Sequence, residues 1–430
     1  RERFATLETE WKAEKELVDR ILDIRARLRG TSEPVEGTGS KLEQAAEAAA
    51  DADGESGADA AGELSDDERK TLLGELTELQ GKLDEMQGES PLILPSVDYQ
   101  AVASVVADWT GIPVGKMVKD EIATVLELAD NLAKRVVGQD HAMHMIAKRI
   151  QTSRASLDNP NKPIGVFMLA GPSGVGKTET ALALAEALYG GEQNIVTINM
   201  SEFQEAHTVS TLKGAPPGYV GYGEGGILTE AVRRKPYSVV LLDEVEKAHS
   251  DVHEIFFQVF DKGLMEDGEG RLIDFKNTLI ILTTNAGTDL IMNMCSDPDL
   301  MPEPEGIAKA LREPLLKEFP AALLGRIVTI PYYPLSRSMI EAISKLQLGR
   351  IAKRVEQNHK VPFTFDDDII DLIASRCTEL DSGGRMIDNI LTNTMLPQIS
   401  REFLNRMISG EAISRVHIGV DDGDFSYAYD

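Results

Sequence analysis

The chain has 430 residues, enough for about two to four domains, and the 42% that are hydrophobic can form a sizeable core. Its 71 acidic residues outnumber 44 basic ones, and a net charge of −27 argues against a nucleic-acid binder or a membrane-surface protein, because both need clustered Lys and Arg. Cys295 and Cys377 are too far apart for a disulfide framework or a local zinc site, and no apolar run is long enough to span a membrane. We therefore expect a protein of the reducing cytosol, and the charged start without an initiator Met indicates a fragment.

The first 90 residues contain two helix-forming stretches separated by an acidic segment. The first stretch, interrupted by Glu14 and Arg25, has apolar residues three and four apart at Phe4, Leu7, Trp11, Val18, Ile21 and Leu28. The second has them at Leu72, Leu76, Leu79, Leu83 and Met86. Residues 31–68 hold about twelve acidic residues and one Lys, with little to bury. We predict a helical hairpin over residues 1–90 with a disordered tip; the alternative is a solvated linker between unrelated helices.

From residue 91 the composition becomes mixed α/β. Apolar or β-branched runs at 164–170, 195–200, 238–243 and 278–284 alternate with helical stretches, as in a buried parallel sheet. After Pro334, helices flank VPFTF (361–365), and alternating apolar residues around DDGD (421–424) predict a hairpin. The predicted fold class is therefore α/β: a P-loop core over 91–335, with a parallel sheet and helices on both faces, then a small α+β lid over 336–430.

The segment GPSGVGKT (171–178) matches the phosphate-binding pattern G-x-x-x-x-G-K-[ST], between a predicted strand and a predicted helix. Backbone N–H groups would wrap the phosphates at the positive end of the helix, Lys177 would neutralise β and γ oxygens, and Thr178 would bind Mg²⁺. The alternative is a structural glycine turn. The pattern predicts an ATP site that includes Pro172, Ser173, Gly174, Val175, Gly176, Lys177, Thr178 and Glu179.

Polar residues end the next two apolar runs. Asp243 and Glu244 follow SVVLL, at the carboxyl edge of a second parallel strand beside the expected phosphates. Asp243 would hold the Mg²⁺ shell, and Glu244 would orient and deprotonate the attacking water, so hydrolysis depends on Glu244. Asn285 ends TLIILTTN, where it can help to place that water. The alternatives are an acidic helix cap for the carboxylates and a turn residue for Asn285.

Six segments in this order resemble the second ATPase module of the Clp/Hsp100 family of AAA+ unfoldases: WTGIPV (109–114), VVGQD (136–140), GPSGVGKT, LLDEVEKAH, LTTNAG and SGGRMID. The resemblance covers roughly residues 91–430 and implies an ATP-driven homo-hexamer that threads polypeptide through a central channel. It implies that Val136 and Val137 pack on adenine and that Arg385 is a nucleotide-sensing lid arginine. It also implies that Arg326, after Gly325 where many relatives have Asn, reaches a neighbouring subunit's γ-phosphate. The alternatives are a surface salt bridge for Arg326 and lid packing for Arg385.

The segment LKGAPPGYVGYGEGG (212–226) sets two tyrosines among six glycines and two prolines. In the resembled family the G-Y-V-G match is the channel loop, which implies that Tyr219 and Val220 contact the substrate. An aromatic ring that covers about 100 Å² of a passing chain gains roughly 2.5 kcal/mol without reading its sequence. Tyr222 is either a second gripping residue or a packing residue. The alternative for the whole segment is a Pro-Gly turn with a surface tyrosine.

Longer segments at 198–226, 236–263 and 383–393 resemble the branch of the family that recycles the contractile sheath of bacterial type VI secretion. The resemblance implies a bacterial cytoplasmic protein whose substrate is a sheath polypeptide, and it makes residues 1–90 part of the family's middle domain. No Ile-Gly-Phe or Leu-Gly-Phe occurs between Gly287 and Pro314, which implies that no peptidase docks. The alternatives are a ClpB-type disaggregase, an ATP-gated scaffold that threads no polypeptide, and a nucleic-acid motor. The acidic tip departs from the long, regular coiled coil of ClpB-type disaggregases.

Overall fold

The computed structural model describes residues 2–29, 66–87, 93, 97, 101–102, 105–106, 109, 121–218, 222–223, 225–297, 300–377, 383–409 and 413–429. The chain divides into two compact units, Arg1–Ala107 and Asp108–Asp430. Among the described residues, no helix has both the length and the apolar character needed to cross a bilayer. The predicted boundaries at 90/91 and 335/336 stay predictions.

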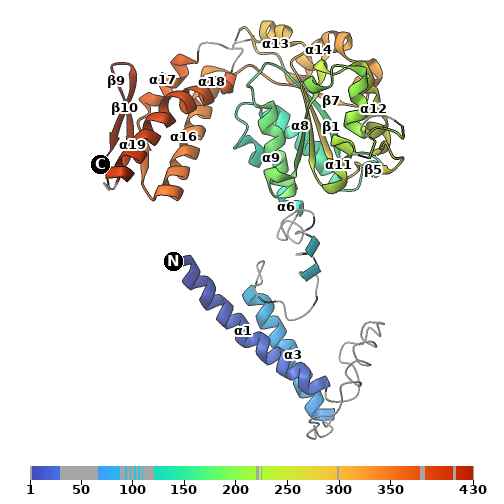
Figure 1. Ribbon diagram of the computed structural model, residues 1–430, viewed down its shortest axis with the longest axis vertical. Coiled ribbons are helices and arrows are strands. Elements are labelled where there is room, and N and C mark those ends of the chain that lie inside the picture. The colour runs from blue at the N-terminus through green and yellow to red at the C-terminus, as the bar shows by residue number, and fades with distance from the viewer. Residues whose placement is uncertain are drawn as a thin grey trace. The chain divides into compact units, whose positions relative to one another are not determined.

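The first unit contains the two predicted helices, α1 (Glu2–Arg29) and α3 (Asp66–Gln87), packed side by side (Figure 1). Their buried seam consists of Val18, Ile21, Ile24, Leu28, Leu76, Leu79 and Leu83. Glu14 is also buried, and its Oε2 accepts hydrogen bonds from Gln87 Nε2 (2.8 Å) and from the Ile93 N–H (3.1 Å). The polar interruption of the seam therefore ties the chain after α3 to α1.

The structure corrects two predictions for the first unit: the length of the apolar seam and the end of the disordered tip. Trp11 and Met86, predicted to lie in the seam, are 41% and 51% exposed, because the helices' shared apolar face ends before them. Most of the predicted disordered tip lies outside the described residues, but α3 begins at Asp66, so its last three residues are helical.

A five-stranded parallel sheet, in the order β2-β3-β6-β1-β7, forms the centre of the second unit (Figure 1). The strands are β1 (Gly165–Ala170), β2 (Ile195–Asn199), β3 (Val239–Asp243), β6 (Leu279–Thr284) and β7 (Val328–Pro331). The first four confirm the four predicted runs. The register pairs Ala170 with Thr284 and Asn199 with Asp243, which aligns the carboxyl ends of the strands.

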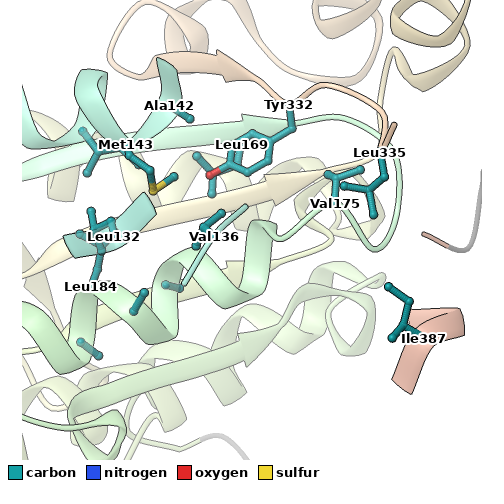
Figure 2. Packing of buried hydrophobic residues seen from close by; sticks show 14 of the residues in the cluster. Leu132, Val136, Ala142, Met143, Leu169, Val175, Leu184, Tyr332, Leu335 and Ile387 are labelled. Atoms are coloured by element: carbon teal, nitrogen blue, oxygen red, sulfur yellow. The ribbon is translucent and has the colours of Figure 1, made fainter. Parts of the chain in front are cut away.

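Helices cover both faces of this sheet, as predicted. One face packs against α7 (Leu128–Ala133), α8 (Asp140–Arg154) and α9 (Lys177–Tyr189), and the other against α11 (Ile227–Arg234), α12 (Ser250–Lys262) and α14 (Pro304–Glu318). Successive β1 residues alternate between the two cores, because strand side chains point to opposite faces. Figure 2 shows Leu169 of β1 near Val136 and Tyr332 on the first face.

A small antiparallel hairpin, β4 (Leu264–Glu266) and β5 (Leu272–Asp274), adjoins the segment predicted to be the channel loop. A Cβ added to Gly268 would lie 2.5 Å from the Gly214 carbonyl carbon, and one added to Gly226 would lie 2.5 Å from the Gly214 nitrogen. The Gly268 N–H donates to the Lys213 carbonyl at 3.0 Å. The backbones at Gly214, Gly226 and Gly268 therefore touch. Tyr219 and Val220 lie outside the described residues.

The lid consists of α16 (Arg337–His359), α17 (Asp368–Arg376), α18 (Gly383–Ile390), a π-helical turn (Leu391–Met395) and α19 (Leu396–Ser409), with a three-stranded sheet. In that sheet β8 (Phe363–Phe365) runs parallel to β9 (Val416–Asp421), which pairs antiparallel with β10 (Asp424–Tyr429). The predicted terminal hairpin is confirmed. The described part of the second unit also includes the short α-helices α6 (Glu121–Leu126), α10 (Val209–Lys213), α13 (Thr288–Met294) and α15 (Ala321–Leu324).

Candidate nucleotide site

Three predicted motifs meet at one edge of the sheet. Because β6 lies between β1 and β3, the loop after β1, the carboxylates at the end of β3 and Asn285 after β6 are neighbours. They surround a cavity of about 210 Å³. The predicted site residues that line it are Val136, Val137, Ser173, Gly174, Val175, Gly176, Lys177, Thr178, Glu179, Asp243, Glu244, Asn285 and Arg385.

Lys177 begins α9, after a loop in which Gly174 and Gly176 adopt left-handed backbone angles (φ 72° and 99°). Its Nζ donates to the carbonyls of Gly171, Pro172 (3.1 Å) and Thr284 (3.1 Å), and to Asn285 Oδ1 (2.8 Å). Pro172, a predicted site residue, contributes this carbonyl and does not line the cavity.

The environment of Lys177 suits an anion. Burial lowers the pKa of its ammonium to about 8, against the opposing effect of nearby carboxylates, chiefly Glu246 and Asp243. The oxygens that hold the ammonium are neutral. A phosphate oxygen is a stronger partner, because its negative charge adds ion-pair attraction to the hydrogen bond. Lys177 is thus held beside the phosphate loop by carbonyl and amide oxygens that the phosphates of a nucleotide can replace.

Thr283 fixes the two carboxylate residues at the end of β3. Its hydroxyl donates to Asp243 Oδ1 and accepts from the backbone N–H of Glu244 at 3.1 Å. Glu244 has φ 56°, a left-handed conformation that non-glycine residues rarely adopt and that clusters at functional sites. The sequence prediction omitted Thr283, although a polar residue near the end of an apolar strand was a visible signal.

Glu246 is a further carboxylate behind the site that the prediction omitted. Its Oε1 accepts a hydrogen bond from the Asn285 N–H at 3.1 Å, and its buried Oε2 has no hydrogen-bond partner among the described residues. It raises the pKa of Lys177 more than any other carboxylate does, so it offsets part of the burial cost of that ammonium. Its place two residues after Glu244, in the quoted DEVEKAH segment, was the available signal.

The oxygen donors in the cavity fit Mg²⁺. Thr178 and Asp243 line the same cavity, and the Asp243 carboxylate is already oriented by Thr283. Mg²⁺ prefers hard oxygen ligands and usually takes one or two from the protein, completing its shell with phosphate oxygens and water. This donor set matches an ion that binds together with a nucleotide.

The lid reaches the phosphate loop through two glycines. The Gly384 N–H donates to the Gly174 carbonyl at 2.9 Å, and a Cβ added to Gly383 would lie 2.9 Å from the Ser173 carbonyl oxygen. This close approach, which a side chain would prevent, brings Arg385 to the cavity, where its charge helps to lower the pKa of Lys177. The two glycines before Arg385 thus allow the lid backbone to contact the backbone of the phosphate loop.

A second connection between the lid and the core runs through Glu179. Its Oε1 accepts from Arg350 of α16 (3.0 Å) and from Arg135 Nε (2.6 Å), and Arg135 also pairs with Glu186 and Glu192. Arg135 and Arg350 line the cavity and were absent from the prediction. Arg135 directly precedes the predicted VVGQD segment, but no sequence pattern reports that either arginine pairs with Glu179.

Arg326 is not among the lining residues of this cavity. Its Nε donates to Asp261 Oδ2 at 2.7 Å, its Nη1 donates to the Ala322 carbonyl at 2.6 Å, and its guanidinium lies 5.7 Å from the centre of the Phe257 ring. The structure therefore holds Arg326 away from the nucleotide site of its own chain.

Comparison with known proteins identifies the family. Residues 162–330 match the AAA domain (Cdc48 subfamily), and residues 335–418 match the C-terminal, D2-small domain of ClpB protein. Over 429 residues, all of this chain, the sequence is 70% identical to the AAA+ ATPase ClpV1 of Pseudomonas aeruginosa. The chain belongs to the Clp/Hsp100 family of AAA+ ATPases. The predicted family is confirmed.

Other Clp/Hsp100 proteins are similar over most of this chain. It is 55% identical over 339 residues to the chaperone protein ClpB of Yersinia enterocolitica, which covers 79% of this chain and 38% of that protein. ClpV1 is covered to 46% of its length, so the chain spans less than half of these curated relatives. A solved closed state of Hsp104 with ATPγS and FITC casein has a TM-score of 0.66 and 29% identity, covering 84% of this chain and 61% of that one.

Proposed function

We propose that this chain is an ATP-hydrolysing module of a Clp/Hsp100 hexamer that threads polypeptide through its central channel. The observation that carries the proposal is the single cavity that unites Lys177, Thr178, Asp243 and Glu244 from the core with Arg385 from the lid. Membership of an AAA+ ATPase family supports nucleotide as the ligand.

Each side chain has a role that its position supports. Val136 and Val137 form an apolar wall with Ile343 and Leu346, suited to adenine. Thr178 and Asp243 would hold Mg²⁺, which when bound neutralises charge on the β and γ phosphates. Glu244, oriented by its backbone bond to Thr283, takes the proton of the attacking water, and Asn285 positions that water.

Arg326 completes the site of a neighbouring subunit in this proposal. It contacts α12 rather than its own cavity, so within one chain it has no phosphate to stabilise. An arginine inserted beside the transferring phosphoryl group contributes about 10³ to 10⁵ in rate, or about 4 to 7 kcal/mol of barrier. Arg326→Ala is therefore expected to abolish most turnover.

We further propose that Tyr219 and Val220 bind the substrate. They lie on the segment whose two ends are held together by backbone contacts of Gly214, Gly226 and Gly268. The substrate class we propose is sheath protein of type VI secretion, supported by the 70% identity to ClpV1, and the compartment is the bacterial cytoplasm. Residues 1–90 would be part of the middle domain.

The hydrolysis proposal is tested by Glu244→Gln. This change keeps the size of the side chain and removes the base, so ATP turnover is expected to fall at least about 100-fold, within the range that general-base catalysis contributes, while ATP stays bound. Turnover and retention of a fluorescent ATP analogue are measured together. Glu254→Gln, an exposed carboxylate on α12, is the control that keeps its activity. Unaltered turnover in Glu244→Gln would overturn the mechanism.

Threading is tested separately by Tyr219→Ala. The variant is expected to hydrolyse ATP but to lose disassembly of contracted type VI sheaths, measured by light scattering. Sheath disassembly that persists would favour an ATP-gated scaffold. Recovery of a heat-aggregated protein by the unaltered chain, without sheath disassembly, would favour a ClpB-type disaggregase.

A further inference from the structure

Arg326 is held by its own chain, through α12. Its Nε lies 2.7 Å from Asp261 Oδ2, and its Nη1 lies 2.6 Å from the Ala322 carbonyl oxygen. Because the guanidinium group is planar, two bonds to different nitrogens fix both its position and its plane. The side chain nevertheless stays 33% exposed, so it is oriented and still accessible from outside the chain.

Asp261 lies in the last turn of α12 and has a second cationic neighbour. Its Oδ1 lies 3.7 Å from Lys162 Nζ, and the side chain is 37% exposed. The Phe257 ring, one helical turn earlier on α12, lies 5.7 Å from the Arg326 guanidinium. One side of α12 therefore supplies both the carboxylate and the aromatic ring that orient the arginine.

The other end of α12 contacts the turn that follows β3. His253 Nε2 donates to the carbonyl of Val245, the residue after Glu244, at 2.9 Å, and the His253 ring lies 5.4 Å from Phe319. A helix of 13 residues is a stiff rod about 20 Å long. α12 thus connects the end of β3, where the chain's own nucleotide site lies, to the arginine that faces away from that site.

We propose that Asp261 is the positioning residue of Arg326: it holds the guanidinium in the orientation that a neighbouring subunit's ATP site needs. The inference rests on the proposed role of Arg326 in the hexamer. Displacement of a catalytic group by about 1 Å can cost about 100-fold in rate, so loss of the carboxylate reduces turnover even though Arg326 remains.

The test compares Asp261→Asn with Arg326→Ala, in the full chain assembled with ATP. Asp261→Asn is expected to lose about 10- to 100-fold in turnover and to keep the affinity for a fluorescent ATP analogue, because its own cavity is intact. Asp261→Glu keeps the charge and recovers part of the rate. Glu254→Gln, two turns earlier on the same helix, keeps full activity.

Mixing subunits separates positioning from folding. Asp261→Asn subunits carry an intact Glu244, and Glu244→Gln subunits carry an intact pair of Asp261 and Arg326. Mixed rings are therefore expected to hydrolyse more ATP than either variant alone. No recovery on mixing, or full activity of Asp261→Asn when Arg326→Ala is inactive, would overturn the role of Asp261. Full activity of Arg326→Ala would instead overturn the proposed function of Arg326 itself.

Discussion

Single side chains decide what the cavity binds and what it can do there. Lys177 is buried and held by neutral oxygens, which leaves its charge available to phosphate. Thr283 orders both Asp243 and Glu244. Its hydroxyl donates a hydrogen bond to the Asp243 carboxylate and accepts one from the Glu244 backbone N–H. Thr283 thus holds the Asp243 carboxylate and the Glu244 backbone, although it has no chemical role of its own in the proposed mechanism.

The buried His253 predicts how stability depends on pH. Burial lowers its pKa below the ordinary value of about 6.5. As the pH falls through that value, the unfolded chain binds a proton that the folded chain resists, so the free energy of unfolding decreases. Denaturant unfolding at about pH 7.5 and pH 5.5 should show a smaller loss for His253→Gln than for the unaltered chain.

The control for this experiment is His207→Gln, whose side chain is 77% exposed and which should keep the pH dependence of the unaltered chain. An identical loss of stability in His253→Gln and the unaltered chain would contradict the buried, neutral imidazole.

The main side chains of the candidate site were predictable because each ends an apolar strand or follows a glycine-rich loop. Thr283 and Glu246 were not predicted, because a threonine inside a strand and a glutamate in a charged turn are ordinary in sequence. Their importance comes from hydrogen bonds to residues 39 or 40 positions away.

At the scale of elements, backbone contacts between distant segments organise the site. α18 meets the phosphate loop through Gly383 and Gly384, and the base of the predicted channel loop meets the turn of the β4–β5 hairpin through Gly268. In both places a side chain would push the elements apart. Glycines thus permit close approach at two separate places: between the lid and the phosphate loop, and at the base of the predicted channel loop.

Gly383→Ala tests the contact between lid and loop. The added Cβ would lie 2.9 Å from the Ser173 carbonyl oxygen, at φ 47°, so α18 must move away and carry Arg385 with it. We expect the Kd for ATP to rise about tenfold, which equals about 1.4 kcal/mol, measured by fluorescence titration.

Gly423→Ala is the matched control for Gly383→Ala. Gly423 also has a left-handed φ (80°), but an added Cβ meets nothing within 4 Å, so this variant has the backbone strain without the collision. Equal ATP affinity in both variants would contradict a role of the lid contact in binding.

The long apolar elements and the VPFTF segment of β8 were predicted, whereas β4, β5 and β7 were missed. β7 has four residues and ends in Pro331, and β4 and β5 have three residues each, too few to show an alternating pattern. Pairing order was also beyond the sequence, because apolar patterns report the burial of each strand and not its neighbours. The position of β6 between β1 and β3, which assembles the site, became visible only in the structure.

At the scale of the whole molecule, the arginine that we propose as a partner of the γ-phosphate, Arg326, lies outside the cavity of its own chain. Arg326 is held on α12, partly exposed, in a chain that matches Clp/Hsp100 proteins along its length. The account therefore requires an assembly in which one subunit's Arg326 meets the next subunit's ATP.

Sedimentation velocity of Glu244→Gln, with and without ATP, tests this requirement most directly. The variant retains ATP without consuming it, so any assembly that depends on bound nucleotide persists during the run. The account predicts that ATP converts the 47.0 kDa chain to a hexamer at micromolar concentration. A 47.0 kDa monomer at every protein concentration, with ATP bound, would contradict it.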